Sequence, residues 1–495
     1  MPADASQPDL LFFFSDQHDG RKAGYAGDPV VETPNLDRLA AEGTVCANAY
    51  TPCPLCVPAR SALLSGQLPS RTGIFSNGQH LRSDRATFLH TLALAGYETV
   101  LVGRMHFKGP DQRHGFTRRV FGDITAVDTG GIPNGGPFGY GMNGCMDVLG
   151  GGDSPVLGYD REVIEAALAY LRQDHDRPQC IVVGTYGPHF PYVAPPDLYR
   201  HYRERVTAPA SWTPETPDPN PIVDGKRQRD RRSPIDGSAQ PVDEEALLAA
   251  RAAYYGMIAL IDRQVGQVRD AWQDRLDRTG RPGVFVYSSD HGDTCGEHGV
   301  FGKQTFYDGS TRVPLLFEGA TVRAGGRLEG ATTLLDIGPT LAAFGGAETP
   351  PDPDGRSLVD DLRDGTDDPE RAVLSEWVHH QDEATVPGRM IRKGRWKLIR
   401  YLDAAAPDQL FDITADPEEM DDRLAAEPAV AAALAEELEA GWNAPHLQAV
   451  LDRNARHLRI VSAWAQGGHL GTPDPIDQWR VPDALHALPE IAAAP

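Results

Sequence analysis

The stretch Leu10-Leu11-Phe12-Phe13-Phe14-Ser15-Asp16-Gln17-His18 is an apolar run of strand length that ends abruptly in polar residues. A second run far along the chain, Val284 to Ser289, ends in the same way and is followed by Asp290-His291. Through the first two thirds of the chain, such runs alternate with helical patterns, which is typical of a mainly parallel sheet covered by helices. We therefore expect an α/β fold with a large mixed, mainly parallel sheet sandwiched by helices.

Capping signals predict where the helices between these strands begin and end. Thr33-Pro34 predicts a helix that stops at Gly43, and a further helix is expected over 87–95. A strand is expected over 99–102. The other predicted elements are helices over 159–172 and 244–272 and a strand over 180–183.

The sequence changes character after the charged stretch Asp364 to Glu370. Met390 to Ile399 predicts a hairpin turning at Lys393-Gly394, and Leu410-Phe411 predicts another strand. Helices are expected over 429–440 and 447–464. We therefore expect two domains, 1–364 and 365–495, the second a smaller α+β unit with a short antiparallel sheet.

The composition excludes several classes of partner. The 495 residues carry a net charge of −23, which repels nucleic acid and anionic membrane surfaces. No stretch approaches the roughly 20 apolar residues of a membrane span, and Leu10 to Phe14 is too short for a signal peptide. We therefore expect a cytoplasmic protein. The six cysteines are scattered, which argues against a disulfide framework.

The polar residues after the two apolar strands form a candidate metal site. Ligands gather at the carboxyl ends of strands in open α/β sheets, so Asp16, Gln17, Asp290 and His291 should lie together. Two neighbouring carboxylates need a cation or a proton between them. Carboxylate and amide oxygens suit calcium or magnesium, while an imidazole also admits manganese or zinc.

A second candidate site is the pentapeptide Cys56-Val57-Pro58-Ala59-Arg60. Pro58 and the apolar run that ends at Gly66 predict a helix beginning near Cys56, and a helix N-terminus favours an anion. Two other interpretations remain open. Cys56 could be a buried thiol, and Cys53-Pro54-Leu55-Cys56 matches the CxxC pattern of redox and zinc sites.

The pentapeptide resembles the signature of the sulfatases, in which the cysteine is oxidised to formylglycine. An aldehyde hydrate attacks sulfur with one hydroxyl and expels sulfate by ionising the other, whereas a serine would be left as a stable ester. The resemblance implies an alkaline phosphatase-like fold with the catalytic domain in 1–364. It also implies a divalent cation, usually calcium, held by Asp16, Gln17, Asp290, His291 and the residue at position 56.

Other motifs of the family match in type and chain order. By resemblance, Lys303 in Phe301-Gly302-Lys303 binds the sulfate, and His189 in Pro188-His189-Phe190-Pro191 donates a proton to the leaving oxygen. Arg104-Met105-His106 resembles a segment in which lysine is usual at the position of Arg104. Arginine keeps the charge but changes the contact geometry. Arg60 is expected to orient the hydrated aldehyde.

The substrate is less sharply indicated than the reaction. Residues 105–116 and 390–398 are similar to those of choline sulfatases, and Glu376 could face a cationic group. A quaternary ammonium favours an aromatic cage, however, so a carbohydrate, alkyl or aryl sulfate remains open. A phosphonate monoester or phosphodiester hydrolase of the same superfamily is the alternative function, and a relative that only binds anions is a third.

Two irregular segments, 130–152 and 207–243, are expected to set specificity together with Trp377, His379 and His380. The second segment contains a basic cluster that we interpret as part of a solvated loop. Its members are Lys226, Arg227, Arg229, Arg231 and Arg232. The expected partners are a sulfate ester, a formylglycine-generating or anaerobic sulfatase-maturing enzyme, and further copies of the chain in a homo-oligomer.

Overall fold

The computed structural model describes residues 7–125, 145–146, 148–213, 216, 218–230, 232–233, 240–381, 384–403 and 405–466. Nine of the described strands form one large sheet. They are β1 (Asp9–Asp16), β2 (Thr44–Tyr50), β3 (Glu98–Gly103), β4 (Arg118–Phe121), β6 (Gln179–Pro188), β10 (Gly283–Ser289), β11 (Arg312–Val313), β12 (Leu315–Gly319) and β13 (Gly326–Thr333).

The strand order is β11-β2-β12-β10-β1-β6-β3-β4, with β13 pairing β2. The central strand β1 runs parallel to both of its neighbours, β10 and β6, and β3 runs parallel to β6 and β4. Antiparallel pairing enters where β12 meets β10 and β2. The predicted mixed, mainly parallel sheet is confirmed.

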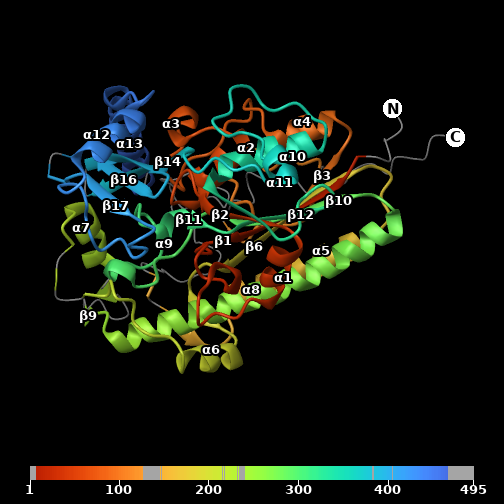
Figure 1. Cartoon of the computed structure of the whole chain (residues 1–495), viewed down its shortest axis with the longest axis horizontal. Helices are drawn as coiled ribbons and strands as arrows, with labels where there is room; N and C mark the ends of the chain where they lie inside the picture. The colour runs from red at the N-terminus through yellow and green to blue at the C-terminus, as the bar shows by residue number, and fades with distance from the viewer. Residues whose placement is uncertain are drawn as a thin grey trace.

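Helices cover both faces of this sheet (Figure 1). One layer contains α1 (Pro34–Glu42), α5 (Pro155–Leu171) and α8 (Glu244–Thr279), and the other contains α2 (Cys56–Ser65), α4 (Phe88–Leu94) and α10 (Ile337–Phe344). Successive residues of β1 point to opposite faces, so Phe12 and Phe14 pack into the second layer and Leu11 and Phe13 into the first. Burial on both faces explains why the strand is continuously apolar.

A second, antiparallel sheet lies at one end of the molecule (Figure 1) and confirms the predicted C-terminal sheet. It comprises β14 (Ala372–Gln381), β15 (Ala384–Lys393), β16 (Trp396–Tyr401) and β17 (Gln409–Asp412), and α12 (Pro428–Glu439) and α13 (Ala444–Gln466) follow it. Lys393 pairs with Trp396, so the hairpin turns at Gly394-Arg395, one residue later than predicted. Gly394 has a φ of 56°, which glycine adopts without steric cost. The domain boundary near residue 365 stays a prediction.

The Pro-rich segment 207–243 contains a helix that the sequence did not reveal. This helix, α7 (Pro221–Asp230), buries Lys226 and Arg227, so the interpretation of these two residues as part of a solvated loop was wrong. Most of the other irregular segment, 130–152, lies outside the described residues.

The remaining elements are short. The helices are α3 (Pro69–Thr72), α6 (Pro196–Arg203), α9 (Asp308–Thr311), α11 (Val359–Asp364) and single 3₁₀ turns at Gly24–Ala26, Glu297–Gly299 and Leu334–Asp336; the strands are β5 (Leu149–Gly151), β7 (Tyr192–Ala194), β8 (Arg232–Ser233) and β9 (Gln240–Pro241). Across the described ranges, no helix combines the length and the apolar character that crossing a membrane requires.

Candidate functional site

The ends of β1 and β10 bring the two predicted carboxylates together. Ser15 lies opposite Ser289 in the parallel register, so Asp16 and Asp290 leave the sheet side by side. Arg60 of α2 joins them, because its Nε donates to Asp290 Oδ2 at 2.9 Å and an Nη donates to Asp16 Oδ2 at 3.0 Å. All three side chains are almost fully buried, so these ion pairs are shielded from solvent.

Cys56 is the first residue of α2 and is fully buried. Its Sγ lies 3.2 Å from both His291 Nε2 and Lys303 Nζ, and 4.0 Å from Asp16 Oδ1. Burial and the Asp16 carboxylate act to raise the pKa of the thiol, but Lys303 and His291 outweigh them and lower it. Position 56 therefore lies in a surrounding that favours negative charge.

Four of the predicted metal-binding residues form one compact donor cluster. One ligand atom from each of Asp16, Cys56, Asp290 and His291 lies within 4.8 Å of the others. Gln17 adjoins the cluster with a backbone φ of 73°, and its Oε1 accepts from Lys303 at 2.8 Å. Two carboxylates and an imidazole at this spacing are a suitable donor set for a divalent cation.

His189 follows β6 and meets Lys303 across the site. Its Nε2 lies 2.7 Å from Lys303 Nζ, and its Nδ1 lies 2.6 Å from the carbonyl oxygen of Phe190, to which it can only donate. Burial and the neighbouring Lys303 hold the pKa of His189 well below its usual range. The imidazole is therefore neutral, with its proton on Nδ1 and Nε2 free to accept from Lys303.

Arg104 follows β3 and ties the histidine beside it to the carboxylates. Its Nε donates to Asp16 Oδ2 at 2.9 Å, and an Nη lies 2.8 Å from His106 Nδ1. Burial and Arg104 lower the pKa of His106 well below its usual value. Burial alone would raise the pKa of Asp16, but the cations Arg104, Arg60 and Lys303 hold it well below the usual range. Asp16 is therefore ionised.

Several residues that contact the site escaped the sequence reasoning. Asn77 accepts from the backbone N of Val57 at 3.0 Å, and its Nδ2 lies 3.8 Å from Cys56 Sγ. Asp123 accepts from the backbone N of His106 at 2.7 Å. Asp160 accepts from the backbone of Tyr186 and Gly187 at 2.7 Å each. None of these three belongs to a recognised motif, and the strand β4 that precedes Asp123 was not predicted, so the sequence reasoning had no signal for them.

Asp293 is a further residue that the sequence reasoning missed. Its Oδ2 accepts from Gln17 Nε2 at 2.6 Å and from the hydroxyl of Tyr192 at 2.8 Å. In this case a signal was present, because Asp293 follows the predicted metal ligand Asp290 by only three residues. Because Asp293 lies so close in the sequence to the end of this strand, it could have been predicted to bind and orient Gln17.

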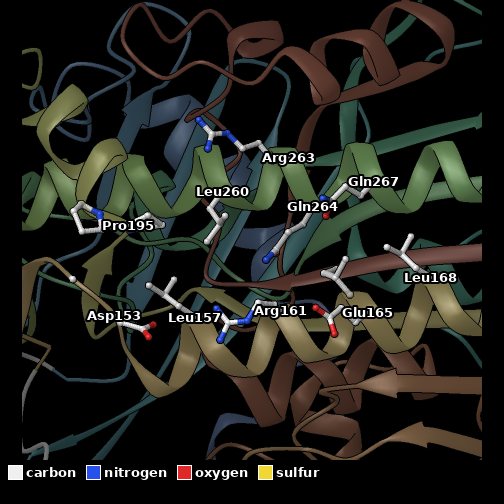
Figure 2. Close-up of a pocket in the computed structure, with 13 residues that line it drawn as sticks. Asp153, Leu157, Arg161, Glu165, Leu168, Pro195, Leu260, Arg263, Gln264 and Gln267 are labelled. Carbon is white, nitrogen blue, oxygen red and sulfur yellow. The ribbon is translucent and has the colours of Figure 1, made fainter.

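The site opens into a cavity of about 450 Å³. The predicted residues that line it are Cys56, Arg104, His106, His189 and Lys303. A larger cavity of about 680 Å³ lies between α5 and α8, with Leu157 and Arg161 on one side and Leu260 and Arg263 on the other (Figure 2). It holds none of the predicted catalytic or metal-binding residues, so side-chain chemistry rather than volume marks the candidate site.

Glu376, which was expected to face a cationic group of the substrate, has a partner inside the protein. Its Oε1 accepts from an Nη of Arg389 at 2.6 Å, and its Oε2 accepts from the backbone N of Ser70 at 2.6 Å. Trp377 and His379 are also buried, and neither is among the described residues that line the cavity. The side chain of His380 lies outside what the structure describes.

Comparison with known proteins places this arrangement in context. Residues 8–347 match the family model described as "Sulfatase", and residues 296–443 match "N-sulphoglucosamine sulphohydrolase, C-terminal". The choline-sulfatase of Rhizobium meliloti (strain 1021) is 35% identical over 437 residues, covering 84% of this chain and 82% of that protein. Arylsulfatase K of Xenopus laevis is 27% identical over 434 residues, covering 83% and 78%.

A solved structure supports the same fold. The crystal structure of the phosphonate monoester hydrolase of Agrobacterium radiobacter superposes with a TM-score of 0.72 and covers 88% of this chain and 95% of that chain. The two sequences are 24% identical, so this likeness concerns the fold alone.

Proposed function

Since the chain belongs to the sulfatase family of the alkaline phosphatase superfamily and is a sulfuric ester hydrolase, we propose that it cleaves its ester with a formylglycine made from Cys56. The observation that carries the proposal is the convergence of His291 Nε2 and Lys303 Nζ, each 3.2 Å from Cys56 Sγ. That sulfur stands where the oxygens of a hydrated aldehyde would lie. Its place at the start of α2 adds the positive end of a helix dipole.

The donor cluster fits a divalent cation, and we assign Asp16, Gln17, Asp290, His291 and residue 56 to hold it. Arg60 occupies Oδ2 of each aspartate, while their Oδ1 atoms lie 3.8 Å and 3.5 Å from His291 Nε2. When bound, the ion supplies positive charge that neutralises the sulfate and lowers the pKa of a nearby hydroxyl. The oxygen donors favour calcium, and magnesium and manganese are the other candidates.

The remaining side chains divide the tasks of binding and proton transfer. Lys303 binds the sulfate, and its 2.7 Å contact with His189 Nε2 supports a joint role of the two in delivering a proton to the leaving oxygen. Arg104 orients Asp16 and His106. One Nη of Arg104 is buried without a hydrogen-bond partner in the described structure and lies 3.6 Å from Asp123, so it is a donor available to a sulfate oxygen. Arg60 fixes the orientation of the two carboxylates by pairing with Oδ2 of each.

Removal of the cation is expected to lower turnover of an aryl sulfate about a hundredfold or more, because the ion contributes several kcal/mol of charge stabilisation. Dialysis against a chelator, followed by calcium, magnesium or manganese, measures the loss and the ion that restores activity. Metal content by mass spectrometry is an independent readout. Asp290→Asn should lower it, whereas Asp270→Asn, at an exposed aspartate paired with Arg38, should not. Equal metal content in both variants would contradict the assignment.

The reaction class is tested by comparing an aryl sulfate with an aryl phosphodiester of the same leaving group. We expect kcat/KM to be at least about tenfold higher for the sulfate, a difference of about 1.4 kcal/mol in transition-state binding. A preference for the phosphodiester would favour the alternative phosphonate monoester or phosphodiester hydrolase.

The mass of the peptide that contains position 56 tests the conversion to an aldehyde separately. If active protein contained only the unmodified thiol at this position, formylglycine would be ruled out as the nucleophile.

For the alcohol part of the ester we propose choline, carbohydrate and simple alkyl or aryl sulfates as the series to test. The 35% identity to a choline-sulfatase puts choline sulfate first. Tyr186 and Phe190 line the cavity, but their rings already face Arg104 and Lys303 at 4.4 Å and 5.5 Å. The maturing enzyme, the homo-oligomer and the cytoplasmic location stay predictions.

A further inference from the structure

An ion pair on α7 holds both polar backbone groups of a single residue next to the site. Lys226 and Asp230 are one helical turn apart, with Lys226 Nζ 2.7 Å from Asp230 Oδ2. The same Oδ2 accepts from the backbone N of Phe301 at 3.1 Å, and the same Nζ donates to the carbonyl oxygen of Phe301 at 3.1 Å. Both side chains are largely buried, so water competes little for these contacts.

Phe301 lies two residues before Lys303, and the backbone between them is also fixed. The N of Gly302 donates to Asp293 Oδ1 at 2.9 Å, and its carbonyl oxygen accepts from the N of Thr294 at 2.8 Å. Lys303 then places its Nζ within 3.2 Å of Gln17, Cys56 and His189. A displacement of Phe301 would therefore also displace the Lys303 ammonium group, because the short backbone segment between them is held by hydrogen bonds.

Helix α7 is itself anchored away from the site. Ile222 and Val223 are buried in a cluster with Trp377 and Met390 of the C-terminal sheet. At the start of the helix, Asn220 Nδ2 donates to Gln409 Oε1 of β17 at 3.0 Å. The C-terminal sheet thus supports the helix, and the helix supports the loop that carries Lys303.

We propose that Lys226 and Asp230 are positioning residues that set the place of Lys303 in the site by holding Phe301. They act through the backbone of residues 301–303 rather than on the reacting atoms. This inference rests on the proposed role of Lys303 in binding the sulfate. It gives the Pro-rich segment a function in the reaction, because it supplies the helix that aligns a sulfate-binding group.

The ion pair also lines the cavity, so a direct contact with the alcohol part of a substrate has to be separated from positioning. Inorganic sulfate separates them, because it lacks that part and reports on the sulfate-binding groups alone. The matched control is Gln228→Ala. Gln228 contacts Asp224 across one turn of the same helix at 2.6 Å and is exposed.

The experiment is a double-mutant cycle in the full chain, with Lys226→Met and Lys303→Ala made singly and together. We measure inorganic sulfate binding by calorimetry and turnover of an aryl sulfate. Lys226→Met should weaken both about ten- to a hundredfold, the scale expected when a binding group shifts by about 1 Å. In the Lys303→Ala background the same change should cost less than about twofold, because residues that act through one another are not additive.

Asp230→Asn is the second variant, and it carries the test if Lys226→Met does not fold. It retains an oxygen that can accept from Phe301 but removes the negative charge. The decrease in sulfate binding and turnover should therefore be smaller than in Lys226→Met, and it should also vanish in the Lys303→Ala background. Equal losses in both backgrounds, or losses no larger than that of Gln228→Ala, would overturn the inference. If Lys303→Ala itself leaves sulfate binding unchanged, the proposed role of Lys303 fails and this inference fails with it.

Discussion

Replacement of Cys56 by alanine is expected to lower sulfate ester turnover by about 10⁴-fold or more, the scale on which loss of a covalent nucleophile slows other hydrolases. Alanine cannot be converted to an aldehyde. The acidic and basic groups around position 56, including Asp16 and Lys303, would stay in place but would have no nucleophile to activate. Initial rates with an aryl sulfate measure the loss, and thermal unfolding checks that the variant is folded.

Cys53→Ala is the matched control, because Cys53 belongs to the same CxxC pattern. It is buried between the two sheets, and burial together with Glu376 raises its pKa well above the usual value. We expect this variant to retain turnover, with a stability loss of about 1 kcal/mol from the small cavity. If the two variants lose activity equally, the CxxC interpretation gains and the nucleophile at position 56 is in doubt. Substantial turnover by Cys56→Ala would refute the proposed reaction directly.

The largest effect on stability is expected at Lys397, a fully buried lysine of β16. Its Nζ lies 2.7 Å from Asp308 Oδ1 and 2.7 Å from Glu419 Oε1, joining β16 of the C-terminal sheet to α9. Lys397→Met keeps the length and the apolar stem but removes the cation paired with the buried Glu419, and it leaves Asp308 with Arg312 at 3.7 Å. Breaking a buried ion pair in this way costs about 3–5 kcal/mol, measurable as a lower free energy of unfolding in denaturant.

The pH dependence of the stability loss distinguishes a broken buried ion pair from a packing defect. Burial already raises the pKa of Glu419 to about 7, against the pull of Lys397, and removal of the lysine should raise it further. A carboxyl whose pKa is higher in the folded state than in the unfolded state gains stability as the pH falls, so the loss in Lys397→Met should shrink from pH 8 to pH 5. A loss that does not change with pH would point to packing. Lys393→Met, at a partly exposed lysine of β15 paired with Glu437, should have little effect.

The sequence predicted those parts of the site that follow from general rules of sheet geometry. Asp16 ends the apolar strand β1 and Asp290 directly follows β10, and polar groups at the carboxyl ends of neighbouring parallel strands meet. The register of Ser15 against Ser289 shows why this rule applies here. The start of α2 at Cys56 was predictable for a similar reason, because Pro58 and Gly66 bracket one helix.

Contacts that depend on tertiary packing could not be predicted in the same way. Helix α7 lies in a Pro-rich segment without apolar periodicity, and its Lys226 and Asp230 bond to the backbone of Phe301, which is distant in the sequence. Glu376 lies directly opposite Arg389 in the β14–β15 ladder, so it has an internal partner that depends on strand register. A register of two strands is a property of their pairing, which single-strand patterns do not contain.

The complete burial of α2 has a consequence for the biosynthesis of the protein. Every residue of the helix is buried, and Cys56 has no exposed surface in the folded chain. A modifying enzyme that binds the chain around Cys56 can therefore act only before α2 is buried. His291, which follows Cys56 by 235 residues, leaves the ribosome about 10–50 s later at 5–20 residues per second. The proposed oxidation thus belongs to the period of translation and early folding, and chains that fold unmodified would remain permanently inactive.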